Sequence, residues 1–173
     1  MNKKIEKKEK EAKTITSDST KKTSSFSVLK NTINFLKKKK NYFDYIIMLE
    51  PTSPLRNSKD VDFCINKIKK DNIESLVSVS RVVDQHPYFL YSINKRNILR
   101  PYLKKQKKLY IRRQDVSPLY YLEGSIYISK ITTLLNEKTW YHKKTQAFEV
   151  EKWKSLEIDD IDDFKLAQFY LQN

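Results

Sequence analysis

The sequence is poor in cysteine and glycine, with one of each among 173 residues, Cys64 and Gly124. A single cysteine cannot form a disulfide within the chain, which is typical of proteins of the reducing cytoplasm. A single glycine excludes a glycine-rich loop of the kind whose backbone N–H groups surround nucleotide phosphates. No apolar run approaches the roughly 20 residues that a membrane span needs, and the lysine-rich N-terminus lacks the apolar segment of a signal peptide. We therefore expect a cytoplasmic location and no membrane partner.

Acidic residues and arginine are also scarce. The chain has 35 basic residues against 21 acidic ones, which gives a formal net charge of +14. A basic chain can bind nucleic acid, but residues 1–40 alone carry thirteen lysines and four acids, so the rest of the chain carries only +5. Lysines outnumber arginines 29 to six, whereas proteins that read nucleic acid favour arginine. This distribution indicates that nucleic acid is not a partner.

Apolar residues make up 39% of the chain and aromatic residues 12%, which is enough for one globular domain with a core. Residues 1–13 are charged on nearly every helical face, so we expect a separate charged segment there and one domain over residues 14–173. The run Lys37–Lys40 indicates a solvated helix end, because cations suit the negative end of the helix dipole.

The first half of the domain alternates predicted helices with predicted strands. Apolar residues spaced by 3, 4 and 3 predict a helix over residues 26–36, and the apolar run at residues 45–49 predicts a buried strand. Ser58 is the expected N-cap of a second helix, which carries an apolar stripe at residues 61–68. Residues 76–80 alternate as a strand does. This order predicts an α/β domain with parallel strands and covering helices.

The second half contains a predicted hairpin, in which residues 88–93 pair with residues 98–102. Residues 119–128 predict another strand, with Gly124 at a bulge or at a close approach of the backbone. A short helix at residues 131–135, a strand at residues 147–150 and a final helix opened by Asp160–Phe164 complete the chain. In the final helix we expect four side chains to face inward: Ile161, Phe164, Ala167 and Leu171.

The strand at residues 45–49 runs directly into a polar loop that contains two prolines. Residues 49–56 read Leu-Glu-Pro-Thr-Ser-Pro-Leu-Arg, and open α/β sheets place ligands at the carboxyl ends of such strands. The pattern alone favours a simple strand followed by a turn. The segment resembles the Leu-Gln-Pro-Thr-Ser-Pro-Leu-Arg sequence of the N-acylneuraminate cytidylyltransferases, the CMP-sialic acid synthetases. In that resemblance, Glu50 stands where the family has a glutamine that contacts the sugar.

A second block lies further along the chain. Arg113-Gln114 followed by Glu123-Gly124-Ser125-Ile126-Tyr127-Ile128 resembles the family's Arg-Gln … Asn-Gly-Ala-Ile-Tyr-Ile block. The resemblance implies that Arg113 holds the sugar carboxylate, that Tyr127 lies along the sugar face, and that Trp140 and Tyr141 lie near the N-acyl group. A guanidinium fork suits a carboxylate. The residue types alone leave open a surface arginine and core aromatic residues.

A third block contains paired acids. Residues 155–164 resemble the family's Ser-Ile-Asp-Ile-Asp-Thr-Glu-x-Asp-Phe sequence. On an extended chain Glu157 and Asp159 point to the same side, and carboxylate oxygens are ligands that Mg²⁺ takes alongside substrate phosphates. We therefore expect Mg²⁺ on Asp159, with Glu157 assisting, and we expect Asp159 and Arg113 to be the catalytic residues. The other interpretation, acids that only open a helix, suits the later aspartates better than Glu157.

The resemblance extends from about Thr16 to the C-terminus. It places Asp18 and Ser19 near the cytidine, and it provides no counterpart for the family's opening strand and its Ala-Arg-x-x-Ser-Lys phosphate loop. The resemblance therefore implies an N-terminally truncated form of an α/β three-layer, nucleotide-diphospho-sugar transferase-like (Rossmann-like) fold. In this fold we expect a mixed, mostly parallel sheet that lacks its first βα unit and has an unpaired edge. Residues 87–129 would form an antiparallel excursion that covers the sugar site and supports a homodimer.

The activity implied is transfer of a cytidylyl group from CTP to a nine-carbon, sialic-type sugar acid, with Mg²⁺ as cofactor and pyrophosphate as the second product. Glu50, Glu123 and Glu157 each differ from the family pattern, so the identity of the sugar acid stays open and legionaminic or pseudaminic acid are alternatives. Because the phosphate loop has no counterpart, a non-catalytic remnant or partner subunit is the alternative of a different class.

Overall fold

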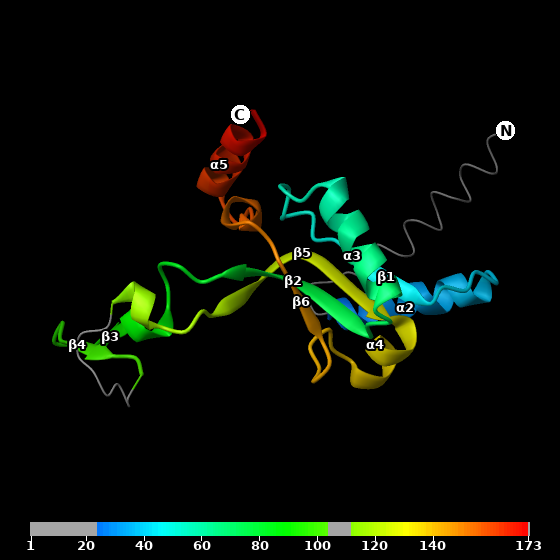
Figure 1. Cartoon of the computed structure of the whole chain (residues 1–173), viewed down its shortest axis with the longest axis horizontal. Helices are drawn as coiled ribbons and strands as arrows, with labels where there is room; N and C mark the ends of the chain where they lie inside the picture. The colour runs from blue at the N-terminus through cyan, green and yellow to red at the C-terminus, as the bar shows by residue number, and fades with distance from the viewer. Residues whose placement is uncertain (1–23, 104–111, 173) are drawn as a thin grey trace.

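The computed structural model of the chain describes residues 24–103 and 112–172 (Figure 1). Its helices are α2 (Ser25–Lys38), α3 (Ser58–Lys70), α4 (Ile131–Glu137) and α5 (Ile161–Gln172), with short 3₁₀ turns η1 (Pro87–Phe89), η2 (Arg113–Asp115) and η3 (Lys152–Ser155). Its strands are β1 (Tyr45–Met48), β2 (Ser75–Arg81), β3 (Tyr91–Ile93), β4 (Leu99–Pro101), β5 (Tyr120–Lys130) and β6 (Gln146–Glu149). The predicted order of helices and strands is confirmed, and the domain is a mixed α/β structure.

A four-stranded sheet with the order β1-β5-β2-β6 forms the centre of the molecule. β5 runs antiparallel to both β1 and β2, whereas β2 and β6 are parallel. Three of the four strands, β1, β2 and β6, therefore run in the same direction, as expected of a mixed, mostly parallel sheet. Two of the three neighbouring pairs are nevertheless antiparallel, because β5 lies between the two strands that helix α3 connects. Among the described residues, β1 pairs on one side only, as expected of an unpaired edge.

Side chains that alternate along the strands build a core on each face of the sheet. On one face Leu76, Ile126 and Ile128 pack with Cys64 and Ile68 of α3. The opposite face carries Val77, Val79 and Tyr127, which pack with Leu134 of α4, with Trp140, and with Phe26 and Leu29 of α2. Since successive strand residues point to opposite faces, this alternation gives three layers: α3, the sheet, and α2 with α4. The more specific assignment to a nucleotide-diphospho-sugar transferase-like fold stays a prediction.

Helix α3 starts with a reciprocal cap. The Asn57 side chain accepts a hydrogen bond from the Asp60 backbone N–H, and the Asp60 carboxylate accepts one from the Asn57 N–H, both at 3.0 Å. The N-cap is therefore Asn57 and not the predicted Ser58. The asparagine oxygen accepts from the third helical N–H, and the carboxylate of that third residue accepts from the Asn57 N–H, which is a capping box.

Helix α5 departs from its expected packing. Of the four residues expected to face inward only Ala167 is buried, while Ile161 and Leu171 are 64% and 66% exposed. Figure 1 shows the reason: α5 stands clear of the sheet at the C-terminal end instead of covering it. The apolar periodicity correctly predicted that these residues form a helix. It did not show whether another part of the chain would cover the apolar face of that helix.

The β3–β4 hairpin forms as predicted, with Tyr91 opposite Pro101 and Ile93 opposite Leu99. It lies on an arm that projects from the main sheet, far from β1 (Figure 1). Within one chain it therefore does not cover the carboxyl end of β1. Across the described residues, no helix combines the length and apolar character needed to cross a membrane.

Candidate functional site

The site begins at an irregularity in β5. Val77 of β2 pairs with Tyr127, but Val79 pairs with Leu122, so the single residue Ser78 faces a longer stretch of β5. The Ser78 hydroxyl fills the gap by accepting a hydrogen bond from the Ile126 N–H at 2.8 Å and donating one to the Ile126 carbonyl at 3.1 Å. Such bulges redirect side chains and often lie next to active sites. The bulge turns residues 123–126 out of the regular ladder.

Gly124 lies in this bulge, and both parts of its prediction are confirmed. Its φ of +84° is a conformation that residues with a side chain rarely adopt. A Cβ added here would lie 2.5 Å from Glu157 Oε1 and 3.4 Å from Ser53 Oγ. Strand β5, the two-proline loop (residues 49–56) and the acidic segment (residues 155–159) therefore lie against one another at Gly124.

The two-proline loop is held by its own arginine and by the acidic segment. Arg56 donates to the carbonyl oxygens of Glu50 and Ser53, the latter at 2.8 Å. The Ile158 N–H donates to the Thr52 carbonyl at 2.8 Å, which ties residues 155–159 to the loop. Sequence reasoning missed this role of Arg56, since an arginine after a turn carries no sign of where its guanidinium points.

Four acidic side chains lie near one another at this junction. The pKa of Glu157 is raised above its ordinary value, first by partial removal from water and then by the negative charges of Asp159, Glu123 and Glu50. Glu123 is only 1% exposed, and its Oε2 has no hydrogen-bond partner in the described structure. The same holds for the buried Ser53 Oγ. Glu123 was known from the sequence only as a departure from the family pattern.

The remaining acids of this region open α5. Asp163 accepts hydrogen bonds from the backbone N–H groups of Asp159 and Asp160, and Asp160 accepts them from Asp162 and Asp163. The helix-start interpretation is thus right for Asp160 and Asp163. The carboxylates of Glu157 and Asp159, the two acids expected to bind metal, accept none of these capping hydrogen bonds.

Aromatic side chains border the acids. The Tyr127 ring centroid lies 5.6 Å from that of Trp140 and 6.3 Å from that of Tyr141. Burial raises the pKa of Tyr127 above its ordinary value, as do its hydrogen bond with Tyr141 and the negative charges of Glu50 and Glu157. Tyr127 and Trp140 belong to the core, whereas Tyr141 is 47% exposed. The structure therefore brings together Glu50, the three aromatic residues, Glu157 and Asp159.

Arg113 lies elsewhere. It pairs with Asp84 at 2.6 Å, and Lys152 pairs with the other oxygen of the same carboxylate at 3.1 Å. These two partners, Lys152 first, lower the pKa of Asp84. Beside them is an open cavity of about 330 Å³, lined by Arg81, Val82, Val83, Asp84, Gln85, Tyr121 and Lys152. Arg113 and Lys152 thus pair with Asp84 and not with the four acids. Asp18 and Ser19 lie outside the described residues.

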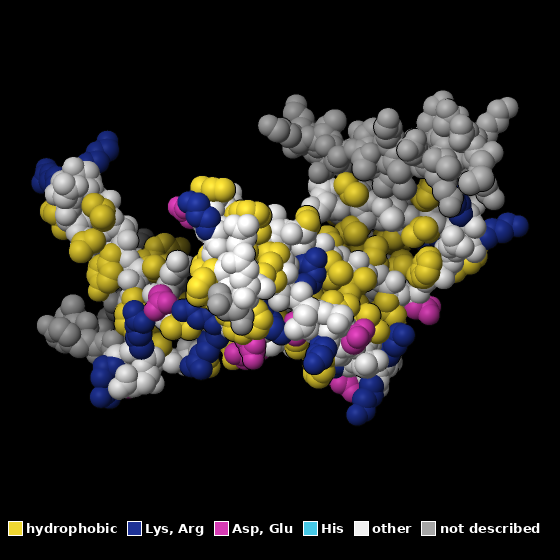
Figure 2. Space-filling model, turned by 90° about the horizontal axis from the view of Figure 1, so that it is seen from above, with side chains coloured by type: hydrophobic (Ala, Val, Ile, Leu, Met, Phe, Trp, Pro, Cys, Tyr) yellow, Lys and Arg dark blue, Asp and Glu magenta, His cyan; other side chains and the backbone are white. Residues whose placement is uncertain are grey.

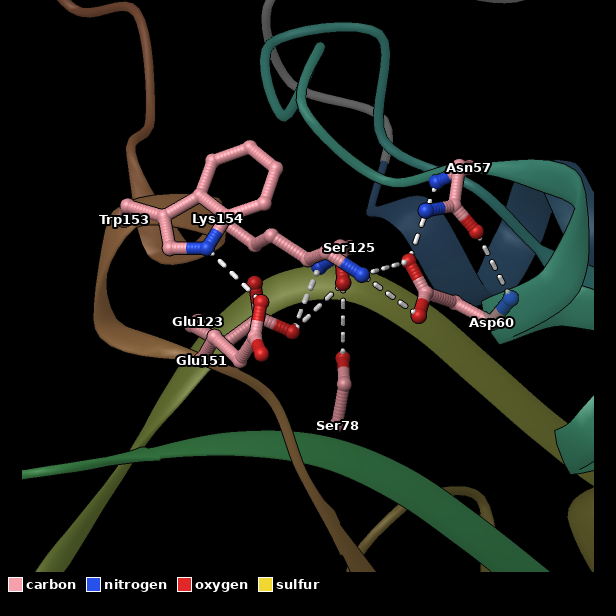
Figure 3. Close-up of polar contacts among 8 residues, drawn as sticks. All are labelled: Asn57, Asp60, Ser78, Glu123, Ser125, Glu151, Trp153 and Lys154. Carbon is pink, nitrogen blue, oxygen red and sulfur yellow. Dashed lines mark hydrogen bonds and ion pairs between the residues drawn. The ribbon is translucent and has the colours of Figure 1, made fainter. Parts of the chain in front are cut away.

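A partly buried ion pair fixes the segment that leads to Glu157. Lys154 of η3 donates to both carboxylate oxygens of Asp60 on α3, at 2.8 and 3.0 Å. Both side chains are 13% exposed. Figure 3 shows this pair next to the bulge, with Glu123, Ser125 and Ser78 beneath it. Neither residue was predicted, because they are far apart in the sequence and each is an ordinary surface residue type.

The donor set suits a hard cation. Among the residues that the structure describes, no three His, Cys, Asp or Glu side chains could hold a metal ion by themselves. Mg²⁺ does not need such a cage, since it usually takes one or two carboxylates and completes its shell with water and substrate phosphates. Glu157 and Asp159 would provide the two carboxylates of such a site.

Comparison with known proteins shows which proteins this chain is similar to. No family model matches the chain. The N-acylneuraminate cytidylyltransferase of Streptococcus agalactiae serotype III is 33% identical over 118 residues, which is 68% of this chain and 28% of that protein. The chain is a homologue of the N-acylneuraminate cytidylyltransferases. The resemblance seen in the sequence motifs is thereby confirmed.

Two further homologues widen the group. The CMP-N,N'-diacetyllegionaminic acid synthase of Legionella pneumophila is 30% identical over 129 residues, 73% of this chain and 53% of that protein. The post-translational flagellin modification protein B of Campylobacter coli is 30% identical over 136 residues, 75% of this chain and 54% of that protein. The chain thus spans between about a quarter and about half of the length of these relatives.

Proposed function

We propose that this chain is part of a cytidylyltransferase that activates a nonulosonic sugar acid with CTP. One observation carries the proposal: the two-proline loop, the Gly124 bulge and the Glu157–Asp159 segment converge on one place in a homologue of named cytidylyltransferases. The names of the relatives cover both sialic and legionaminic acids. We therefore propose the class of sugar acid and leave the individual sugar to the product assay.

In the proposed reaction the anomeric hydroxyl oxygen attacks the α-phosphorus of CTP. The new O–P bond forms as the bond to the β-phosphate oxygen breaks, pyrophosphate leaves, and the hydroxyl proton passes to water. Such a transfer depends on positioning and on charge neutralisation more than on covalent chemistry. A Mg²⁺ ion held by Asp159 and Glu157 would supply that neutralisation for the phosphates.

The aromatic residues would position the sugar. The Tyr127 hydroxyl hydrogen-bonds with Tyr141, and this bond would hold the tyrosine ring that meets the sugar face. Tyr141 has an exposed face and would contact the N-acyl group beside Trp140. We propose that Arg113 leaves its ion pair with Asp84 when the substrate binds. Its guanidinium group would then pair with the carboxylate of the sugar acid. Asp18 and Ser19 would contact the cytidine.

The exposed hairpin supports a homodimer. Its apolar side chains face solvent in one chain, and Figure 2 shows apolar atoms along this arm at the left. The residues concerned are Tyr91, Ile93, Ile98, Leu99 and Tyr102. Apolar patches of this kind mark contact surfaces, so Ile93→Lys should convert a dimer to a monomer in sedimentation experiments. If the wild-type chain and Ile93→Lys sediment with the same mass, the hairpin is not the dimer contact.

The activity is tested by incubating the chain with CTP, Mg²⁺ and either N-acetylneuraminate or N,N'-diacetyllegionaminate, and by measuring pyrophosphate and the CMP-sugar. Asp159→Ala should abolish product, whereas Asp162→Ala, a nearby acid paired with Lys165, should not. Full activity of Asp159→Ala would contradict the role of Asp159.

The alternative is a chain that binds a sugar acid or a second subunit without turnover. It is favoured by the lack of a glycine-rich loop in these 173 residues. Titration with CTP in the presence of Mg²⁺ separates the two, since the alternative predicts no CTP binding. The cytoplasmic location expected from the single cysteine stays a prediction.

A further inference from the structure

The open cavity beside Asp84 carries more positive than negative charge. Its volume is about 330 Å³, and among its wall residues Arg81 and Lys152 are cations while Asp84 is the one acid. Arg113 adds a third cation, because its guanidinium group pairs with an oxygen of Asp84 at 2.6 Å. These four groups leave an excess of two positive charges at a cavity whose size falls within the range of ligand pockets.

Arg81 is the cation of this cluster that has no partner. It is the exposed last residue of β2, and no described residue forms an ion pair or a hydrogen bond with its guanidinium group. Because β1 and β2 run in the same direction, Arg81 lies at the same edge of the sheet as the two-proline loop that follows β1. Open α/β sheets bind ligands at this edge. The N–H donors of Arg81 are thus available to an anion.

Asp84 shows which kind of anion suits the cluster. Its two carboxylate oxygens pair with different cations, Oδ1 with Arg113 at 2.6 Å and Oδ2 with Lys152 at 3.1 Å. All three side chains are more than half exposed, so water competes for these ion pairs and each is weak. The carboxylate of a substrate can therefore replace that of Asp84 at little cost.

The cavity is joined to the acidic segment. Tyr121 forms part of the cavity wall, and its hydroxyl shares a hydrogen bond with the Ser155 hydroxyl at 2.8 Å. Lys152 and Ser155 both belong to η3, and Ser155 precedes Glu157 by two residues. Two residues of extended chain span at most about 7 Å. The cavity wall is therefore tied to the segment that carries Glu157.

We propose that this cavity binds the carboxylate of the sugar acid, with Arg81 and Lys152 as binding residues beside Arg113. Asp84 occupies the place of that carboxylate until the substrate arrives. The proposal rests on the proposed function, which supplies a substrate with a carboxylate. When the acid binds, Arg81 pairs with it, Arg113 and Lys152 transfer to it from Asp84, and Asp84 turns to water.

The physical reason is competition for the same cations. A guanidinium group forms paired hydrogen bonds with a carboxylate, and Asp84 offers the same chemical group as the substrate. Removing Arg81 takes away one attraction, whereas removing the charge of Asp84 takes away the competitor. The two changes therefore act on acid binding in opposite directions, which a purely structural role of this cluster does not predict.

The test measures binding of N-acetylneuraminate to the full chain by NMR titration, with and without CTP and with no divalent cation, so that no turnover occurs. Arg81→Gln should weaken binding about three- to fivefold, the size expected for one exposed ion pair. Asp84→Asn should strengthen binding by a similar factor. Lys69→Gln removes one positive charge from an exposed position on α3 and should leave the affinity unchanged. Unchanged or weaker binding by Asp84→Asn would overturn the proposal.

Two further ligands show which group the cavity recognises. The methyl ester of N-acetylneuraminate keeps the sugar but lacks the charge, so its affinity should be the same in wild type, Arg81→Gln and Asp84→Asn. An ester that responds to both variants as the acid does would contradict carboxylate recognition. Inorganic phosphate should bind more weakly than the acid, and tighter binding of phosphate would overturn the carboxylate assignment.

The outcomes separate this inference from the proposed function. If the wild-type chain binds N-acetylneuraminate or N,N'-diacetyllegionaminate and forms product, while Arg81→Gln and Asp84→Asn bind the acid like wild type, only the assignment of the cavity is wrong. If the wild-type chain binds neither acid, the sugar site of the proposed function fails as well.

Discussion

Replacing Gly124 by alanine tests the junction on which the site depends. The added Cβ would lie 2.5 Å from Glu157 Oε1, which is closer than carbon and oxygen can approach, and 3.4 Å from Ser53 Oγ, which is ordinary contact. The backbone at Gly124 has φ +84°, where a residue with a Cβ costs about 1–2 kcal/mol. The substitution therefore combines a backbone cost with a displaced carboxylate.

The two costs have different consequences. Glu157 Oε1 is the end of a flexible side chain, so the collision is relieved cheaply by moving the carboxylate, and stability falls mainly by the backbone cost. A loss of about 1–2 kcal/mol lowers the melting temperature of a chain of this size by about 2–8 °C. The moved carboxylate would no longer lie beside Asp159, so divalent cation affinity should fall together with pyrophosphate release.

A double-variant comparison provides the measurement. Urea unfolding followed by circular dichroism gives the free energy of unfolding of Gly124→Ala in the wild-type and Glu157→Ala backgrounds. We expect the same loss in both, because the backbone cost does not depend on Glu157. A Gly124→Ala chain with wild-type stability and wild-type Mn²⁺ affinity would refute the whole account of the bulge.

Three further outcomes are expected. The pKa of Glu157 is raised in the folded chain, so the folded state binds this proton more tightly than the unfolded state does. The free energy of unfolding should therefore fall as the pH rises above 4.5. In urea unfolding, Glu157→Gln should lack this part of the fall. Burial, with the charges of Asp60 and Glu123, raises the pKa of Cys64 to about 12, so iodoacetamide at about pH 8 should modify the unfolded chain and not the native one; rapid native labelling would contradict its burial. Lys154→Met should cost about 3 kcal/mol, because the largely buried carboxylate of Asp60 loses its only cation among the described residues. The exposed Lys165→Met should cost well under 1 kcal/mol, and equal losses would contradict the importance of burial.

Much of the secondary structure could be predicted because it depends on neighbours in the sequence. The apolar stripe of α2 and the alternation in β2 follow from the geometry of a helix and of a strand. The hairpin could be predicted from its central turn, and Gly124 from the rarity of glycine within a strand. Errors came where the partner was distant: α5 has the periodicity of a packed helix, but nothing in the described chain lies against most of it.

The candidate site was predicted in part. The motifs named Glu50, Tyr127, Trp140, Tyr141, Glu157 and Asp159. Of these, Glu157 lies against the Gly124 bulge, Glu50 and Asp159 act on its charge, and the rings of Trp140 and Tyr141 contact that of Tyr127. The structure places Arg113 against Asp84 instead. Sequence reasoning did not find the loop-locking role of Arg56 or the free oxygen of Glu123, because both depend on where a side chain points after folding.

The sequence by itself determined which segments become helices and strands, where a turn must occur, and which proteins this chain is related to. These properties depend on burial periodicity and on backbone preferences that act over a few residues. Only the tertiary structure decided that β5 lies between β1 and β2, and that Lys154 pairs with Asp60 across 94 residues. Such choices depend on which distant surfaces meet, and the residue types on either side carry no local sign of their partner.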